Sequence, residues 1–139
     1  MASIRELVVA NLSTALETLA KTVRIPTNVF EVTEFPTIAI YDLSEDMDVD
    51  SPVSKTNCHL HVDLHYYGLA QHDVSLAANT AVAEVNKVIR IDPRRGGNAI
   101  HTHMVKNTTV LTEEVSPYYV VVMNVDIIYR FKNDDPYAL

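Results

Sequence analysis

The sequence has one cysteine, Cys58, no tryptophan and three glycines among its 139 residues. With a single cysteine no internal disulfide can form, which excludes a small secreted scaffold held by disulfides and agrees with a reducing compartment. No apolar run approaches the roughly 18 residues that a membrane-spanning helix needs, so we expect no membrane partner. The N-terminal segment has no small-residue cleavage pattern, so we expect no signal peptide and a chain made in a cytoplasm.

Positive charge is also scarce. There are 11 Lys and Arg against 18 Asp and Glu, for a formal net charge of −7, and the only adjacent basic pair is Arg94-Arg95. A protein that binds nucleic acid through its phosphates needs clustered positive charge. The composition therefore argues against such a function, while 47% hydrophobic residues are enough for a globular core.

The clearest local pattern is the segment Tyr118 to Phe131, in which every odd-numbered residue is apolar. Among the even-numbered residues, Asn124, Asp126 and Arg130 are polar. An alternation of period 2 that is rich in β-branched and aromatic residues predicts a long strand. We expect this strand to be central in a sheet, with its odd face packed against helices.

Two amphipathic helices are predicted. The first runs from about Ile4 to Val23, where apolar residues form one stripe and Ser3 and Glu6 have the spacing of a capping box. The second starts after Asp73, a suitable N-cap, and ends before Pro93.

The remaining elements are expected to be strands joined by loops. Asn28 to Val32 and Thr37 to Tyr41 are short β-rich runs, Cys58 to Tyr67 alternates strictly, and Ile100 to Thr112 alternates weakly, as near a sheet edge. The acidic and polar stretch around 42–57 is predicted to be an exposed loop. Strands in runs with helices between them predict one domain, residues 1–139, of the α+β class. We expect a mixed or mostly antiparallel sheet of about five strands with both helices on one face.

Two His-x-His pairs on predicted strands offer a possible metal site. His59 and His61, like His101 and His103, would each point to one side of a strand and could bind Zn²⁺ or Fe²⁺, with Asp63 or His65 as a further ligand. The alternative is a solvated or inter-subunit polar face of the sheet. We favour that alternative because no second shell can be identified, and we expect no cofactor.

The other candidate motifs fail at required positions. Asp46-x-Asp48-x-Asp50 resembles the start of a Ca²⁺ loop, but Ser51 replaces the glycine and Asn57 the twelfth-position glutamate. Arg94-Arg95-Gly96-Gly97 follows a helix instead of preceding one, unlike a phosphate-binding loop. No nucleophile elbow is present, and Cys58 is interpreted as a small buried hydrophobe. We therefore do not expect an enzyme.

The order of elements, together with the C-terminal run Tyr129-Arg130-Phe131-Lys132-Asn133-Asp134-Asp135-Pro136-Tyr137, is similar to the tail terminator, or tail completion, proteins of long-tailed bacteriophages. The resemblance implies a structural virion protein of the tail or neck, assembled in the host cytoplasm. It implies a hexameric ring that caps the tail tube, stops its polymerisation and carries out head-tail joining. Its partners would be the tail tube protein, the head-tail connector protein and the sheath protein where one exists, with the genome DNA passing through an acidic lumen without specific binding.

The resemblance also directs attention to exposed segments as interfaces. Residues expected to contact neighbouring subunits or partners are Asp46, Asp48, Asp50, Arg94, Arg95, Asp134, Asp135 and Tyr137. Two readings stay open beside it: another connector or neck protein of the same viruses, and a small metal-binding domain or enzyme built on the His-x-His strands. A stand-alone binding module is a third.

Overall fold

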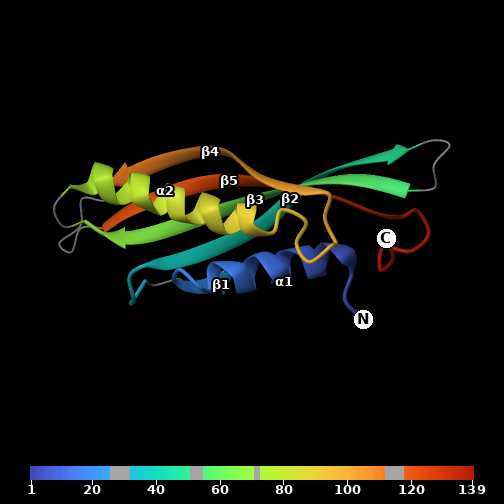
Figure 1. The fold of residues 1–139 in the computed structure, drawn as a ribbon, viewed down its shortest axis with the longest axis horizontal. Helices are drawn as coiled ribbons and strands as arrows, with labels where there is room; N and C mark the ends of the chain where they lie inside the picture. The colour runs from blue at the N-terminus through green and yellow to red at the C-terminus, as the bar shows by residue number, and fades with distance from the viewer. Residues whose placement is uncertain (26–31, 51–54, 71–72, 112–117) are drawn as a thin grey trace.

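The computed structural model describes residues 1–25, 32–50, 55–70, 73–111 and 118–139. Seven elements follow one another along the chain (Figure 1). They are α1 (Ile4–Leu16), β1 (Lys21–Arg24), β2 (Thr37–Asp50), β3 (Lys55–Leu69), α2 (Val74–Ile91), β4 (His101–Leu111) and β5 (Tyr118–Lys132). The α+β class, with two helices and a five-stranded mixed sheet, is confirmed.

The strands form one sheet in the order β1-β2-β3-β5-β4. All hydrogen-bonded pairs in the described residues are antiparallel except β1 and β2, which run parallel. The predicted edge position of Ile100 to Thr112 is confirmed, since β4 ends the sheet. α2 connects β3 to β4, but β5 lies between these two strands, so the crossover creates no parallel pair.

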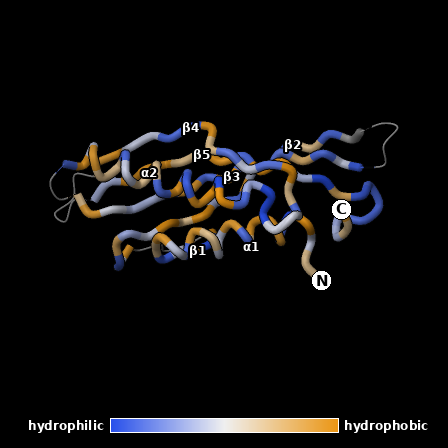
Figure 2. The backbone as a smooth tube through the Cα atoms, in the orientation of Figure 1, coloured by the Kyte–Doolittle hydropathy of each residue, from blue (hydrophilic) through white to orange (hydrophobic). Residues whose placement is uncertain are grey.

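β5 is an interior strand with one buried face, as its alternation predicts. Tyr119, Val121, Met123, Val125, Ile127 and Tyr129 are all buried. They join the buried residues of α1, α2 and β3 in one core cluster, which places both helices on this face of the sheet. Figure 2 shows hydrophobic residues, in orange, along α1 and along the strands of the sheet. In the described residues no helix is both long and apolar enough to cross a membrane.

α1 is shorter than its apolar periodicity predicts. It ends at Leu16, with Glu17 as C-cap, and the next residues turn into the parallel strand β1. Thr18 donates its hydroxyl to the Ala15 carbonyl (2.8 Å) instead of continuing the helix. Val23, which falls on the helical stripe by spacing alone, pairs with Ala39 of β2. The prediction of a helix as far as Val23 was wrong because a short β-branched run can continue a helical stripe by coincidence.

The helix starts were predicted correctly. Ser3 Oγ accepts the Glu6 backbone N–H (3.1 Å), and Asp73 Oδ1 accepts that of Leu76 (3.0 Å). The second half of the expected capping box is not made, because the Glu6 carboxylate binds Arg24. The start of α1 is also tied to the chain end, since the Ile4 N–H donates to the Pro136 carbonyl (3.1 Å).

The predicted acidic loop around 42–57 is largely strand. β2 continues to Asp50 and β3 begins at Lys55, with pairs from Ser44↔His61 to Asp50↔Lys55. We call residues 43–50 with residues 55–61 the β2–β3 arm, which projects beyond the helices in Figure 1. Asp46, Asp48 and Asp50 alternate with Met47 and Val49, which is strand periodicity. The prediction of a loop was wrong because it rested on the polarity of this stretch and not on its alternation. Of the run Asn28 to Val32, residues 28–31 lie outside the described residues and Val32 is not in a strand.

Gly68 is required by a close approach. It pairs with Tyr119 across β3 and β5, and a Cβ at position 68 would overlap the tyrosine ring. Tyr119 is buried and cannot easily move aside.

We therefore expect Gly68→Ala to lower the free energy of unfolding by about 1–3 kcal/mol in urea titrations. When Tyr119 is also replaced by Ala, the loss of unfolding free energy caused by Gly68→Ala should largely disappear. An unchanged loss would mean that the overlap with the Tyr119 ring does not cause it.

Candidate functional site

The sheet face opposite the helices carries most of the candidate polar residues. On β3 the residues between the buried ones, including His59, His61, Asp63 and His65, point to this side. The even-numbered residues of β5 share it, as the pairing of His61 with Asp126 and of Asp63 with Asn124 shows. We call this surface the open face.

His61 joins three strands on the open face. Its Nε2 lies 2.8 Å from Asp46 Oδ2 on β2, and its Nδ1 lies 2.8 Å from Asp126 Oδ1 on β5. An imidazole can donate from both nitrogens only when it is protonated. Hydrogen bonds to Asp46 and Asp126 accordingly raise the pKa of His61, against a smaller opposing effect of burial. Because Asp46 is 83% exposed and Asp126 only 23%, water screens the first contact more, and we expect Asp126 to be the steadier partner.

The two His-x-His pairs do face the same side of the sheet. β5 separates them: Ile128 pairs with both His59 and His101, and Asp126 pairs with both His61 and His103. The His101 and His103 rings stack with centroids 5.3 Å apart. Both nitrogens of His61 are already occupied by carboxylates. Among the described residues no group of three or more His, Cys, Asp or Glu is arranged to hold a metal.

The acidic run of the arm lies on one side of β2. Asp46 and Asp48 stand at alternate positions opposite His59 and Asn57, so both belong to the open face. Asp48 is exposed, and Asp50 is the last residue of the strand. The structure thus arranges a row of carboxylates along a strand instead of a Ca²⁺-binding loop.

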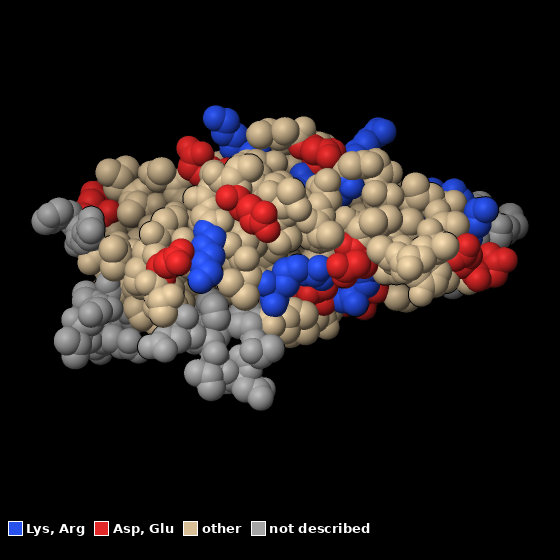
Figure 3. All heavy atoms as spheres, turned by 90° about the horizontal axis from the view of Figure 1, so that it is seen from below, with Lys and Arg blue, Asp and Glu red and all other residues tan. Residues whose placement is uncertain are grey.

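A cluster of charges that the sequence did not reveal fastens α1 to β1 and β2. The Arg24 guanidinium binds both Glu6 oxygens (2.6 and 3.1 Å) and lies 3.7 Å from the Asp42 carboxylate. Arg5 donates to the Asp42 carbonyl (2.5 Å) and lies 3.9 Å from Glu45. Figure 3 shows such acidic and basic side chains next to one another on this side of the molecule. Local sequence patterns cannot predict these pairs, which join positions far apart in the chain.

A second polar contact reaches from this cluster into the core. The buried Tyr129 hydroxyl donates to Glu45, and burial is the main cause that raises the pKa of Tyr129 far above its ordinary value. Cys58, buried beside it as predicted, has a pKa raised chiefly by burial.

Arg95 was wrongly expected to contact a partner. It is fully buried, and its Nη2 donates to the carbonyls of Ile89 (2.8 Å) and Asp92 at the end of α2. The side chain therefore satisfies helix carbonyls that lack intrahelical partners. Arg94 is exposed, so its predicted contact with a partner stays a prediction.

The C-terminal segment is folded against the chain. The Asp135 N–H donates to the Lys132 carbonyl (3.0 Å), and Asp135 Oδ1 accepts the Tyr137 N–H (3.0 Å). Asp134 and Tyr137 are exposed. These contacts position the segment, and they leave its predicted interface role untested.

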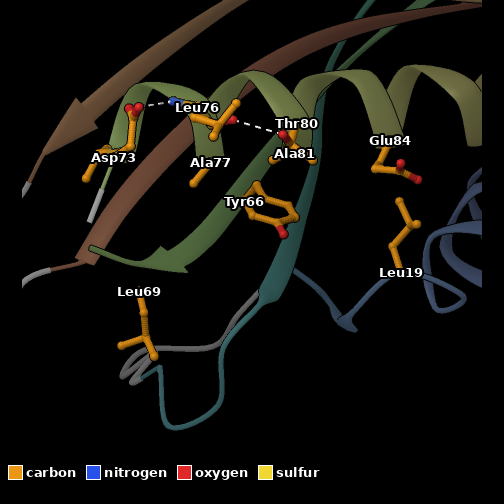
Figure 4. A pocket seen from close by; sticks show the side chains of 10 residues that line it. Leu19, Tyr66, Leu69, Asp73, Leu76, Ala77, Thr80, Ala81 and Glu84 are labelled. Carbon is orange, nitrogen blue, oxygen red and sulfur yellow. Dashed lines mark hydrogen bonds between the residues drawn. The ribbon is translucent and has the colours of Figure 1, made fainter. Parts of the chain in front are cut away.

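An apolar groove lies between α2 and the ends of β3 and α1 (Figure 4). It has a volume of about 570 Å³. Tyr66 lies beneath α2, and Leu19, Leu69, Leu76, Ala77 and Glu84 also line it. Its titratable lining residues within the described part of the chain are Tyr66, Asp73 and Glu84.

The chain was compared with protein families, curated proteins and solved structures. No protein-family model matches the chain, and no curated protein matches it. A search of solved structures finds a chain described as "Virion of native gene transfer agent (GTA) particle", with 8% sequence identity and a TM-score of 0.41. The alignment covers 91% of this chain and 92% of that chain. A TM-score this low carries no weight for function.

His61 gives a prediction for pH dependence. Because its pKa is raised in the folded state, the stabilisation is fully present below the ordinary histidine pKa and is lost as pH rises through the raised value. NMR titration of the His61 ring should show the raised pKa, and Asp126→Asn should bring it back toward the ordinary range. Asp46→Asn should have the smaller effect; the reverse order would contradict our ranking of the two carboxylates.

The different environments of Arg94 and Arg95 give a second prediction, which concerns stability. Arg95→Ala should lower the free energy of unfolding by about 2–4 kcal/mol, because it leaves the α2 carbonyls unpaired and opens a cavity. Arg94→Ala, at an exposed position, should change it by no more than about 0.5 kcal/mol. Thermal unfolding of the two variants measures the difference, and equal losses would show that Arg95 does not cap the helix.

Proposed function

We propose that this chain is a structural subunit of a bacteriophage virion. In this proposal it is the tail terminator: a hexameric ring that caps the tail tube, stops tube polymerisation and joins the tail to the head connector. The resemblance in element order and C-terminal run supplies the family, and the surface of the sheet supplies the physical argument. The observation that carries it is the exposed edge strand β4.

β4 is an unusual strand for a protein that stays alone in solution. From Val105 to Leu111 every residue is exposed, and the exposed apolar ones include Val105 (58%), Val110 (51%) and Leu111 (57%). A free, partly apolar edge is a template for pairing with another chain, and monomeric proteins usually block it with charged side chains, proline, bulges or a covering element. β4 has no proline, and of these devices it carries one lysine, Lys106, and an irregularity between Met104 and Lys106 that leaves Thr108 to Leu111 in regular pairing with β5. Such an edge is expected of a subunit that assembles.

The charge distribution is compatible with a channel for DNA. The net charge is −7, and the open face carries Asp46, Asp48 and Asp126. A channel lined with carboxylates repels DNA phosphates, so DNA slides through without sticking. Repulsion between six acidic subunits is limited by salt, which screens charges beyond roughly 8 Å at physiological ionic strength.

Five of the expected interface residues are exposed, namely Asp46, Asp48, Arg94, Asp134 and Tyr137. Asp46, Asp48 and Asp50 of the arm would meet a neighbouring subunit or the tube, and Arg94 an acidic group of a partner. Asp134, Asp135 and Tyr137 would pack at a subunit boundary. Arg95 is withdrawn from this set because it is buried.

Electron microscopy of the protein mixed with its tail tubes tests the proposal. We expect rings at one end of the tubes and tubes that no longer lengthen; free tube ends and continued growth would contradict it. A ring that binds the head connector but not the tubes would instead identify a neck protein. Mass measurement in solution adds the subunit number.

The acidic arm can be tested in the same assay. Replacing Asp46, Asp48 and Asp50 by Asn should reduce the fraction of capped tubes severalfold, because it removes the carboxylates that would meet the partner. The exposed Glu17 and Glu84, changed to Gln, provide a control that removes acidic charge on the helices instead. Equal effects of both sets would mean that net charge, and not the arm, matters.

A further inference from the structure

The sheet has two free edges on opposite sides. β4 ends the sheet on one side. On the other side, β1 covers only Thr37 to Ile40 of β2. From Ser44 to Asp50 the only strand partner of β2 within the described ranges is β3. Among the described residues, the outer edge of β2 in the β2–β3 arm therefore has no strand partner.

The directions of the strands determine how these edges can meet. β2 is antiparallel to β3, β3 to β5, and β5 to β4, so β2 and β4 run in opposite directions in one sheet. Within one subunit Lys106 lies level with Tyr41, so residues 105–111 of β4 and residues 43–50 of β2 are at opposite ends of the sheet. A second copy that is not turned over, but is shifted sideways and by roughly seven residues along the strands, would bring residues 43–50 of its β2 beside residues 105–111 of the first copy's β4. The new pair would be antiparallel, which continues the pattern of the sheet and is the more stable type of ladder.

The side chains of the two edges are complementary in charge. Residues 43–50 of β2 contain Glu45, Asp46, Asp48 and Asp50 and no basic residue. β4 contains His101, His103 and Lys106 and no acidic residue. Lys106 forms no ion pair among the described residues. Opposite charges across a strand pair stabilise it, and like charges destabilise it.

Apolar side chains accompany the charges on both edges. Leu43 and Met47 of β2 are 71% and 59% exposed, and more than half of each of Val105, Val110 and Leu111 on β4 is exposed. Burying such side chains contributes about 25 cal/mol per Å² of apolar surface removed from water. The free part of β2 and the exposed part of β4 also have similar lengths, at about 25 Å each for extended chain.

We propose that copies of this chain join head to tail through these edges, with β4 of one copy adding as an antiparallel strand to residues 43–50 of β2 in the next. This names the subunit contact of the proposed function and rests on it. Because the two edges differ, the contact is heterologous and repeats from copy to copy, so it closes into a ring if the rotation per subunit allows. A symmetric contact of β4 with β4 would instead join two edges that carry basic and no acidic side chains.

Disulfide cross-linking of the full-length chain tests the pairing and its direction. Single-cysteine additions at Lys106 and Thr108 are each mixed with additions at Ser44, Asp46 and Asp48, then oxidised at high protein concentration and on tail tubes. The native Cys58 is buried and stays in place. An antiparallel ladder predicts that the β2 position preferred by Thr108→Cys lies about two residues before the one preferred by Lys106→Cys. The opposite shift, or efficient self-linking of Lys106→Cys, overturns the proposal.

A charge exchange gives a second, independent readout. Lys106→Glu should weaken self-association about tenfold, and adding Asp48→Lys should restore it to within about threefold. Lys87→Glu and Glu84→Lys, on the exposed side of α2, make the same charge changes away from both edges. If oligomers or rings form but tolerate Lys106→Glu as well as Lys87→Glu, the strand contact is wrong and the proposed function stands. If the protein forms neither oligomers nor rings on tubes, both are wrong.

Discussion

The long pairing between β3 and β5 is the constraint on which the rest of the structure depends. It runs without a register shift from Lys55↔Lys132 to Leu69↔Tyr118. Because side chains alternate along both strands, one register fixes the apolar face for the helices and the polar open face together. A slip of one residue by β3 would put His61 into the core and Leu60 into water, and a slip by β5 would do the same to Asp126 and Ile127. The same pairing is what brings Gly68 beneath Tyr119.

This pairing is longer than the layer of helices that covers it. The arm continues beyond both helices, whereas the exposed half of β4 lies at the other end of the sheet, beside the start of α2. Polar contacts tie the arm to the rest of the subunit: His61 joins β2 to β5 through two carboxylates, and Arg5 and Arg24 hold β2 to α1. The arm is therefore held in place while its outer edge stays open, which suits an element that acts between molecules.

Sequence periodicity predicted the parts of the fold in which burial alone decides the structure. β5, β3, α2 and both N-caps follow from spacing, because each has one face in the core. The errors occur where another force decides. Residues 17–24 leave the helix because β1 pairs with β2. The acidic arm is strand because it pairs with β3, and His61 and Arg5 lie against two of its carboxylates, Asp46 and Glu45. Arg95 looked like a surface contact, since nothing in a Gly-Gly loop shows that its guanidinium caps a helix.

The positions of the few basic residues determine which surfaces keep a positive charge. Of the positive side chains, Arg5 and Arg24 are used inside the subunit, and Arg95 is buried. Lys106 is left on β4, an edge strand without acidic residues. Two copies with a net charge of −7 repel each other in most orientations, but the repulsion is weakest when this edge faces the acidic arm. Charge interactions would thus determine how two copies are oriented more than how tightly they bind. The apolar side chains beside the charges would supply most of the binding energy.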